Sequence, residues 1–133
     1  GTPVYPLTLA ALARGYARLA QGAPGSAEQQ VKVAIVNHPE LLAGVDRDVS
    51  TLMRALPGAV AKDGFEGIQA VALPDGRALA VKISDGGDRA RMPITATLLL
   101  NALEEAPDDL RALTHSNVEA GPAEERVGKL FAL

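Results

Sequence analysis

The chain has 133 residues and a formal net charge of −3, and 47% of its residues are hydrophobic but only 3% aromatic. This length suits one domain or part of a larger one, with a core built mainly from aliphatic side chains. The acidic balance argues against nucleic acid as the main partner, because phosphate binding needs a basic face. Cysteine is absent, so disulfides and thiolate metal sites are excluded, and no apolar run is long enough to span a membrane. We therefore expect a cytoplasmic protein with no nucleic-acid or membrane partner.

The first part of the chain predicts three helices. Apolar residues recur at helical spacing over 8–20 and again over 47–56. Between these segments Ser26 stands three residues before Gln29, a capping-box pattern that opens a helix ending near Asn37. That middle helix is apolar nearly all round, which predicts that it is well buried.

The second part of the chain predicts a small antiparallel sheet. Short apolar runs over 59–62, 68–73 and 78–84 read as strands. The last two flank the turn signal "PDGR", which favours a hairpin. In the third strand apolar and other residues alternate, which places Lys82 on the more open face.

A long helix is expected after the sheet, over 88–103, with Pro93 either in its first turn or at a kink. The tail is polar, and its last residues, 127–133, predict one further short strand. Together the segments predict an α+β fold, with a helical segment at 1–56 and a sheet-plus-helix segment at 57–133 whose helix packs on the sheet.

Lys62 is the most interesting charged residue, because it comes at the end of an apolar strand and is followed by Gly64 and Gly67. Such a lysine can line a cleft, where it holds a carboxylate or lowers the pKa of a neighbouring hydroxyl. The glycines allow a substrate to approach the backbone closely. By spacing alone, a solvated surface turn is the more common explanation.

Other polar motifs favour structural roles. Asp85 or Asp88 fits a helix cap. Two distant histidines, His38 and His115, make a poor metal site, and Arg47, with Arg54 seven residues later, fits a solvated helix face better than an anion site. The chain also lacks a Ser-x-x-Lys segment, a G-x-S-x-G elbow and a phosphate loop, so it offers a candidate lysine without an evident nucleophile.

Several stretches resemble the asparaginase II family, the thermolabile rhizobial-type L-asparaginases. The most specific are "HPELLAG", "LMRALPG" and "KDGFEG", and the matching segments run in order through about two thirds of the chain. They are 2–20, 37–44, 47–58, 61–68 and 78–91. The family is similar in fold to serine β-lactamases and penicillin-binding proteins, so the resemblance implies that this chain is the C-terminal part of one larger domain.

The resemblance also implies a function and a site. Lys62 matches the lysine that pairs with an active-site serine in the family, and Gly64, Glu66 and Gly67 would shape the substrate-binding wall. The implied reaction is hydrolysis of L-asparagine to L-aspartate and ammonia through a serine acyl-enzyme. The serine would come from an upstream segment or a second chain, so we expect the chain alone to be inactive.

One departure from the family pattern within the chain bears on these expectations. Some rhizobial members bind zinc through cysteines, and Ala70 stands where many relatives have one, so we expect neither a metal nor another cofactor here.

The apolar helix 27–37 cannot bury itself against one small sheet, which predicts contact with an absent segment or another copy in a homo-oligomer. The alternatives are another serine amidase or penicillin-recognising enzyme, or a non-catalytic binding or structural remnant.

Overall fold

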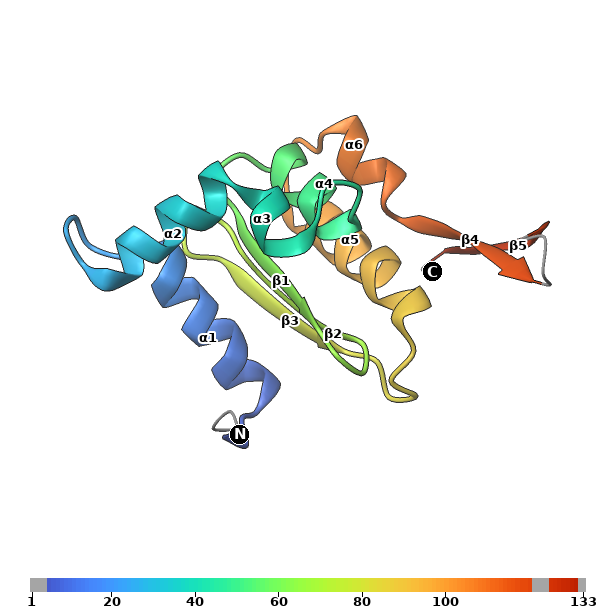
Figure 1. Ribbon diagram of the computed structural model, residues 1–133, viewed down its shortest axis with the longest axis horizontal. Helices are drawn as coiled ribbons and strands as arrows, with labels where there is room; N and C mark the ends of the chain where they lie inside the picture. Colours follow the sequence, from blue (N-terminus) through green and yellow to red (C-terminus); the bar gives the residue numbers. More distant parts are fainter. Residues whose placement is uncertain (1–4, 121–124, 132–133) are drawn as a thin grey trace.

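The computed structural model describes residues 5–120 and 125–131 and confirms the predicted mixed α+β fold (Figure 1). Its α-helices are α1 Leu9–Ala20, α2 Ala27–Asn37, α3 Pro39–Ala43, α4 Asp48–Ala55, α5 Arg91–Ala102 and α6 Asp108–Ala112. A short 3-10 turn, η1 Asp88–Ala90, leads into α5. The main sheet holds β1 Val60–Gly64, β2 Ile68–Ala72 and β3 Ala78–Lys82, and a separate pair holds β4 His115–Ala120 and β5 Glu125–Phe131.

Side-chain caps fix where the first two helices begin. The Thr8 hydroxyl accepts a hydrogen bond from the backbone N–H of Ala11, 3.1 Å away. The Ser26 hydroxyl accepts from the backbone N–H of Gln29 at the same distance, as the capping-box pattern predicts. Both hydroxyls satisfy an N–H that has no partner inside the helix.

The three-stranded sheet is antiparallel throughout and lies between two helical layers (Figure 1). Successive side chains of a strand point to opposite faces. Ala61, opposite Val71 in β2, therefore faces the core under α4 and α5, whereas the equally buried Val60 faces α1. Lys62 shares the face of Val60, and Asp63 shares the face of Ala61.

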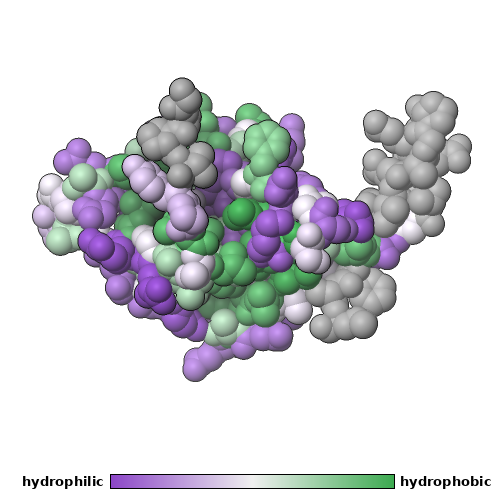
Figure 2. Space-filling model, turned by 90° about the horizontal axis from the view of Figure 1, so that it is seen from below, coloured by the Kyte–Doolittle hydropathy of each residue, from purple (hydrophilic) through white to green (hydrophobic). Residues whose placement is uncertain are grey.

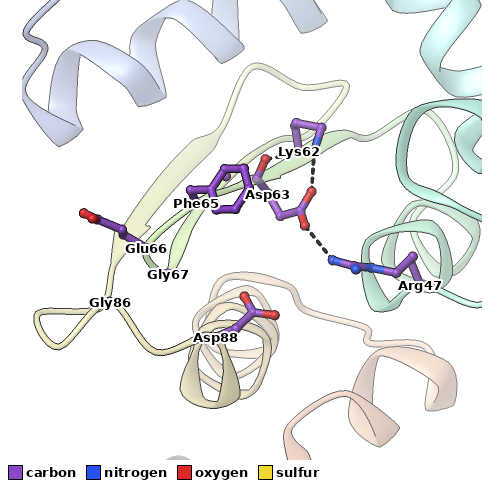
Figure 3. A pocket seen from close by; sticks show the side chains of 9 residues that line it. Arg47, Lys62, Asp63, Phe65, Glu66, Gly67, Gly86 and Asp88 are labelled. Atoms are coloured by element: carbon purple, nitrogen blue, oxygen red, sulfur yellow. Dashed lines mark hydrogen bonds and ion pairs between the residues drawn. The ribbon is translucent and has the colours of Figure 1, made fainter.

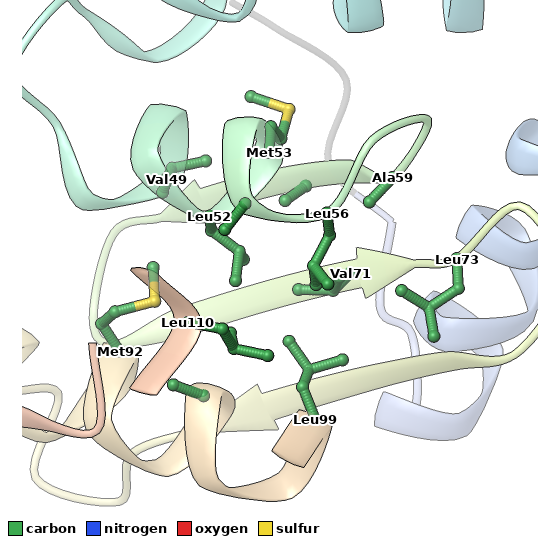
Figure 4. Close-up of a cluster of buried hydrophobic side chains, with 13 residues drawn as sticks. Val49, Leu52, Met53, Leu56, Ala59, Val71, Leu73, Met92, Leu99 and Leu110 are labelled. Carbon is green, nitrogen blue, oxygen red and sulfur yellow. The ribbon is translucent and has the colours of Figure 1, made fainter. Parts of the chain in front are cut away.

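The main core fills the layer between the sheet, α4, α5 and α6 (Figure 4). It is built from aliphatic and methionine side chains, in keeping with the scarcity of aromatic residues. Its members are Val49, Leu52, Met53, Ala55, Leu56, Ala59, Ala61, Val71, Leu73, Met92, Ala96, Leu99 and Leu110. Each large side chain buried here contributes on the order of 1.5–3 kcal/mol by removing apolar surface from water.

Several predicted boundaries need correction. The first strand runs two residues beyond 59–62, so Lys62 lies in mid-strand, paired with Ala70, because backbone pairing continues through Asp63 and Gly64. The third strand ends at Lys82, which is exposed as predicted. The predicted last strand forms as β5, although 132–133 lie outside the described residues.

The long helix after the sheet also begins later than predicted. The segment 88–90 forms the 3-10 turn, and Pro93 sits in the first turn of α5, which was one of its two expected places. Neither Asp85 nor Asp88 caps α5. The carboxylate of Asp85 accepts from the backbone N–H of Gly87, and that of Asp88 binds the side chain of Arg91, so both are already engaged.

The predicted burial of helix 27–37 is wrong for this chain. No residue of α2 is buried, and Val31 and Val33 are 49% and 47% exposed. The helix contacts α1, α3 and β1, but these elements reach only part of its circumference. Apolar residues spread around a helix cannot all face one side, so some remain open.

No helix among residues 5–120 and 125–131 is long and apolar enough to cross a bilayer.

A buried arginine holds the helical and strand layers together at one end of the sheet. The side chain of Arg91 is 0% exposed. Its Nη2 donates to Asp48 Oδ2 of α4 at 2.8 Å, and its Nε donates to Asp88 Oδ1 of η1 at 2.5 Å. Its Nη1 donates to Oε1 of Gln69 in β2. One cation thereby binds three separate elements.

We predict that Arg91→Met lowers the free energy of unfolding by about 3 kcal/mol, because it leaves partly buried polar partners without their cation. Urea denaturation of the chain measures this change. Arg89→Met is the matched control, since its ion pair with Asp85 is exposed and should contribute less than about 1 kcal/mol. Equal effects of the two substitutions would contradict a special role for Arg91.

Candidate functional site

The four site residues expected from the sequence line one pocket of about 480 Å³ at the turn between β1 and β2 (Figure 3). These are Lys62, Gly64, Glu66 and Gly67. The pocket wall is completed by side chains and backbone from α4, the β1–β2 turn and the segment before α5. Those further lining residues are Arg47, Asp63, Phe65, Gly86 and Asp88.

The ammonium of Lys62 lies at the pocket with two close oxygen partners. Its Nζ is 2.5 Å from Oδ1 of Asp63 and 2.9 Å from the backbone oxygen of the same residue. The lysine side chain is 38% exposed, so it is partly open to solvent. The structure thus places the Lys62 side chain at the edge of the sheet, in contact with Asp63, rather than free in solvent.

Asp63 binds a cation on each of its two carboxylate oxygens. Oδ1 accepts from Lys62, and Oδ2 accepts from Nη2 of Arg47 at 2.8 Å (Figure 3). Partial burial alone would raise the pKa of Asp63, but the hydrogen bond from Lys62 and the charges of Lys62 and Arg91 hold it below its ordinary value of 3.8. Asp63 therefore stays ionised at neutral pH.

Arg47 reaches the site from the start of α4. It is the N-cap residue of that helix, and the next residue, Asp48, is bound to the buried Arg91. The Arg47 side chain is 51% exposed, in keeping with the predicted solvated position, but its guanidinium also binds the carboxylate of Asp63, which that prediction did not include. Arg54, by contrast, donates to the backbone oxygen of Val45 and does not line the pocket.

The β1–β2 turn holds its shape through two residues in left-handed conformation. Glu66 has φ +62° and Gly67 has φ +67°. Lys82 donates from Nζ to the backbone oxygen of Glu66 at 2.7 Å, and the backbone N–H of Ile83 donates to the oxygen of Gly67 at 2.9 Å. A non-glycine residue at positive φ is unfavourable, so these contacts stabilise a conformation that the sequence alone disfavours.

The carboxylate of Glu66 points away from Lys62 and Asp63 (Figure 3). Its part in the wall is therefore mainly that of its backbone, next to the backbone of Gly67 and Gly86. The expected wall residues thus form a backbone surface, with charge supplied from β1 and α4.

Sequence reasoning missed Asp63, Phe65 and Asp88 as lining residues, together with the supporting Arg91. Phe65 is 99% exposed at the tip of the turn, which is unusual for an aromatic side chain. An acid directly after the candidate lysine was a visible signal for Asp63. No local pattern pointed to Arg91, whose partner Asp48 lies 43 residues away in the sequence.

The pocket supplies charge but no hydroxyl or thiol nucleophile. None of the nine lining residues found in the described part of the chain is serine, threonine or cysteine. In that same part no group of three or more His, Asp or Glu side chains is arranged to hold a metal ion. The arrangement can stabilise an anion or assist a proton transfer, provided that the attacking group comes from elsewhere.

Comparison with known proteins adds one finding. A family model described as L-asparaginase II matches residues 1–132, nearly the whole chain. A search of curated proteins found no match. The match covers the β1–β2 turn, the helices on both faces of the sheet and the tail.

We predict that Gly67→Ala lowers the free energy of unfolding by about 1–3 kcal/mol. An added Cβ would lie 2.7 Å from the Cβ of Ile83 and 3.0 Å from the oxygen of Gly87, at a positive φ. Gly64→Ala is the matched control, because its nearest contact would be an ordinary 3.6 Å, to the Cβ of Ile68. Thermal unfolding of both variants tests this contrast, and equal losses would contradict it.

We also predict that Asp63 contributes to acid sensitivity. A carboxylate whose pKa is lower in the folded state stabilises the fold above its unfolded pKa, and this contribution is lost as pH falls through the folded value. The stability of the wild-type chain should therefore fall more steeply than that of Asp63→Asn between about pH 5 and pH 2. Urea denaturation at a series of pH values measures both curves, and parallel curves would show that Asp63 contributes nothing.

Proposed function

The chain belongs to the L-asparaginase II family, an assignment that supports asparaginase-type amide hydrolysis, and on this premise we propose that it forms part of an enzyme converting L-asparagine to L-aspartate and ammonia. The observation that carries the proposal is that Lys62, whose side chain is partly exposed, lines the pocket. The chain that holds this pocket matches the family over residues 1–132. An amide hydrolase needs a group that stabilises or transfers charge beside its nucleophile.

In the proposed reaction a serine Oγ attacks the carbon of the side-chain amide. The serine proton is taken up as the new C–O bond forms and is passed to the amide nitrogen, which leaves as ammonia when the C–N bond breaks. Water then cleaves the acyl-enzyme ester, which releases aspartate and restores the serine. As an ammonium, Lys62 assists by lowering the pKa of the serine; to take the serine proton instead, it acts as the neutral amine.

The serine is proposed to come from an upstream segment or a second chain, as the resemblance to serine β-lactamases implies. The lack of a hydroxyl or thiol among the lining residues of the described pocket supports this origin. The edge of β1 is the side from which it would approach, because within the described sheet β1 pairs only with β2.

The β1–β2 turn is proposed as the substrate-binding wall. Gly64 has no positive φ and no crowded neighbour, so its lack of a side chain is not required by the fold. A close approach of substrate to the backbone would explain glycine there. Gly67 and Glu66 hold the wall in shape, since their left-handed backbone fixes the direction of the turn.

The test uses the full-length protein that contains this chain, assayed for ammonia release from L-asparagine. We predict that Lys62→Met lowers kcat/KM by about 10²–10⁴-fold, the usual contribution of a general acid or base. Lys129→Met is the matched control, because Lys129 lies on β5 and does not line the pocket. It should retain wild-type activity.

The isolated 133-residue chain is expected to be inactive in the same assay. Turnover by that chain alone would contradict the proposed origin of the nucleophile. Parallel assays with L-glutamine and a β-lactam identify the substrate class, and a full-length protein that hydrolyses only one of those two would overturn the asparaginase assignment.

A further inference from the structure

We propose that Asp63, anchored by Arg47, is the positioning residue for Lys62, and that this pair determines where the lysine ammonium lies in the pocket. The proposal rests on the proposed function only in giving Lys62 a part in catalysis. Its geometry and its first test stand without any activity.

The position of the ammonium is not set by the strand itself. Lys62 and Asp63 are neighbours in β1, so their side chains leave the sheet on opposite faces. Nevertheless Nζ of Lys62 is 2.5 Å from Oδ1 of Asp63. The lysine must therefore fold around the edge of β1, which in the described sheet is not covered by another strand. A flexible four-carbon stem permits this path but does not enforce it.

Asp63 is restrained far more than Lys62. Its side chain is only 17% exposed, against 38% for the lysine, and Arg47 holds its second oxygen at 2.8 Å. Gln69, the residue opposite Asp63 in β2, accepts a hydrogen bond from the buried Arg91. Arg47 thus restrains one oxygen of the carboxylate, and the more exposed partner of the ion pair between Lys62 and Asp63 is the lysine.

Arg47 is in turn positioned by α4, whose N-cap residue it is. It directly precedes Asp48, whose carboxylate binds Nη2 of Arg91 at 2.8 Å. The start of α4 is therefore tied to the buried arginine on one side and to Asp63 on the other. A continuous series of contacts leads from Arg91 through α4 and Asp63 to the lysine ammonium.

The other charged and titratable groups near Asp63 do not replace this arrangement. Asp88 lines the same pocket, but its carboxylate binds Nε of Arg91. Tyr16 of α1 has its pKa raised by burial and, to a smaller extent, by the charge of Asp63. It remains a neutral phenol at neutral pH and cannot act as the anionic partner of Lys62.

The first test measures the reactivity of each lysine in the folded chain, by competitive labelling with a limiting amine reagent and mass spectrometry. In Asp63→Asn we expect labelling of Lys62 to increase by roughly two- to fivefold, as suits the loss of a partly exposed ion pair. Arg47→Met should produce a smaller increase, because Asp63 remains but is no longer anchored.

Two lysines serve as internal controls in the same sample. Lys129 should label equally in all variants. Lys82 should also be unchanged, because it binds the backbone oxygens of Glu66 and Ile83 rather than a carboxylate. An increase at both Lys62 and Lys82 would mean that the turn has loosened as a whole, which would overturn the specific pairing. Unchanged labelling of Lys62 in Asp63→Asn would overturn it as well.

The second test is kinetic and uses the full-length protein. A positioning role predicts that Asp63→Asn lowers kcat by about 10-fold or more with little change in KM, since a misplaced catalytic group impairs the chemical step. Asp63→Glu should restore part of the rate, and Arg47→Lys should retain more than Arg47→Met. A merely structural role would not produce this graded rescue in variants of equal stability.

The two tests separate the two proposals. If the wild-type protein does not hydrolyse asparagine but labelling of Lys62 depends on Asp63, the proposed function fails and the positioning contact stands. If the wild-type protein is active and Asp63→Asn keeps both its kcat and the protection of Lys62, the positioning role fails and the proposed function stands.

Discussion

The buried guanidinium of Arg91 imposes the strongest constraint on this structure. A charged group removed from water must be met by anions and hydrogen-bond acceptors, or the fold becomes unfavourable. Asp48, Asp88 and Gln69 meet that requirement from α4, η1 and β2. These elements must therefore converge at one end of the sheet, which is the end that carries the β1–β2 turn. The apolar core holds the layers together, but its non-directional packing would not by itself fix their ends so closely.

Charge balance explains how this convergence can lie so close to an accessible lysine. Cations and anions alternate within two groups of ion pairs. In one, Arg91 binds Asp48 and Asp88; in the other, Asp63 binds Arg47 and Lys62. Arg91 is fully buried and has two carboxylate partners, so charges are paired where desolvation is most severe. Lys62 binds one carboxylate, that of Asp63, and its side chain stays 38% exposed. The same alternation therefore satisfies the interior and presents one ammonium to the pocket.

The sequence was sufficient for features that depend on near neighbours. The cap at Ser26, the hairpin at "PDGR" and the exposed side of Lys82 all follow from residues within a few positions of each other. For Pro93 the neighbouring residues left two places open, and the first turn of α5 is the one that it takes. The grouping of Lys62 with the glycines of the turn follows for the same reason. The family resemblance suggested a catalytic role for that group of residues, which spacing alone could not indicate.

What the sequence could not provide were contacts between distant elements. Arg91 is the first residue of α5 and resembles an ordinary polar start, although two of its three partners lie 43 and 22 residues earlier. Arg47 resembles a solvated residue because its acceptor is in another element. The exposure of α2 was misjudged because hydrophobic residues around a helix show how much surface could be buried, not how much the rest of the chain can cover.

The two sides of the pocket are built on different physical principles, and this difference bears on how a substrate would be held. The turn side is rigid backbone, fixed by the left-handed pair Glu66 and Gly67 and by the hydrogen bonds from β3 and the residue that follows it. The charged side depends on ion pairs whose outer members are partly exposed and respond to pH and salt. The turn would therefore select substrates by their shape, because its backbone is held in place. Lys62 and the carboxylate of Asp63 would set the charge that faces the substrate. A glutamate at positive φ is unfavourable for the turn, so the wall keeps its shape only because Lys82 and Ile83 hydrogen-bond the oxygens of Glu66 and Gly67.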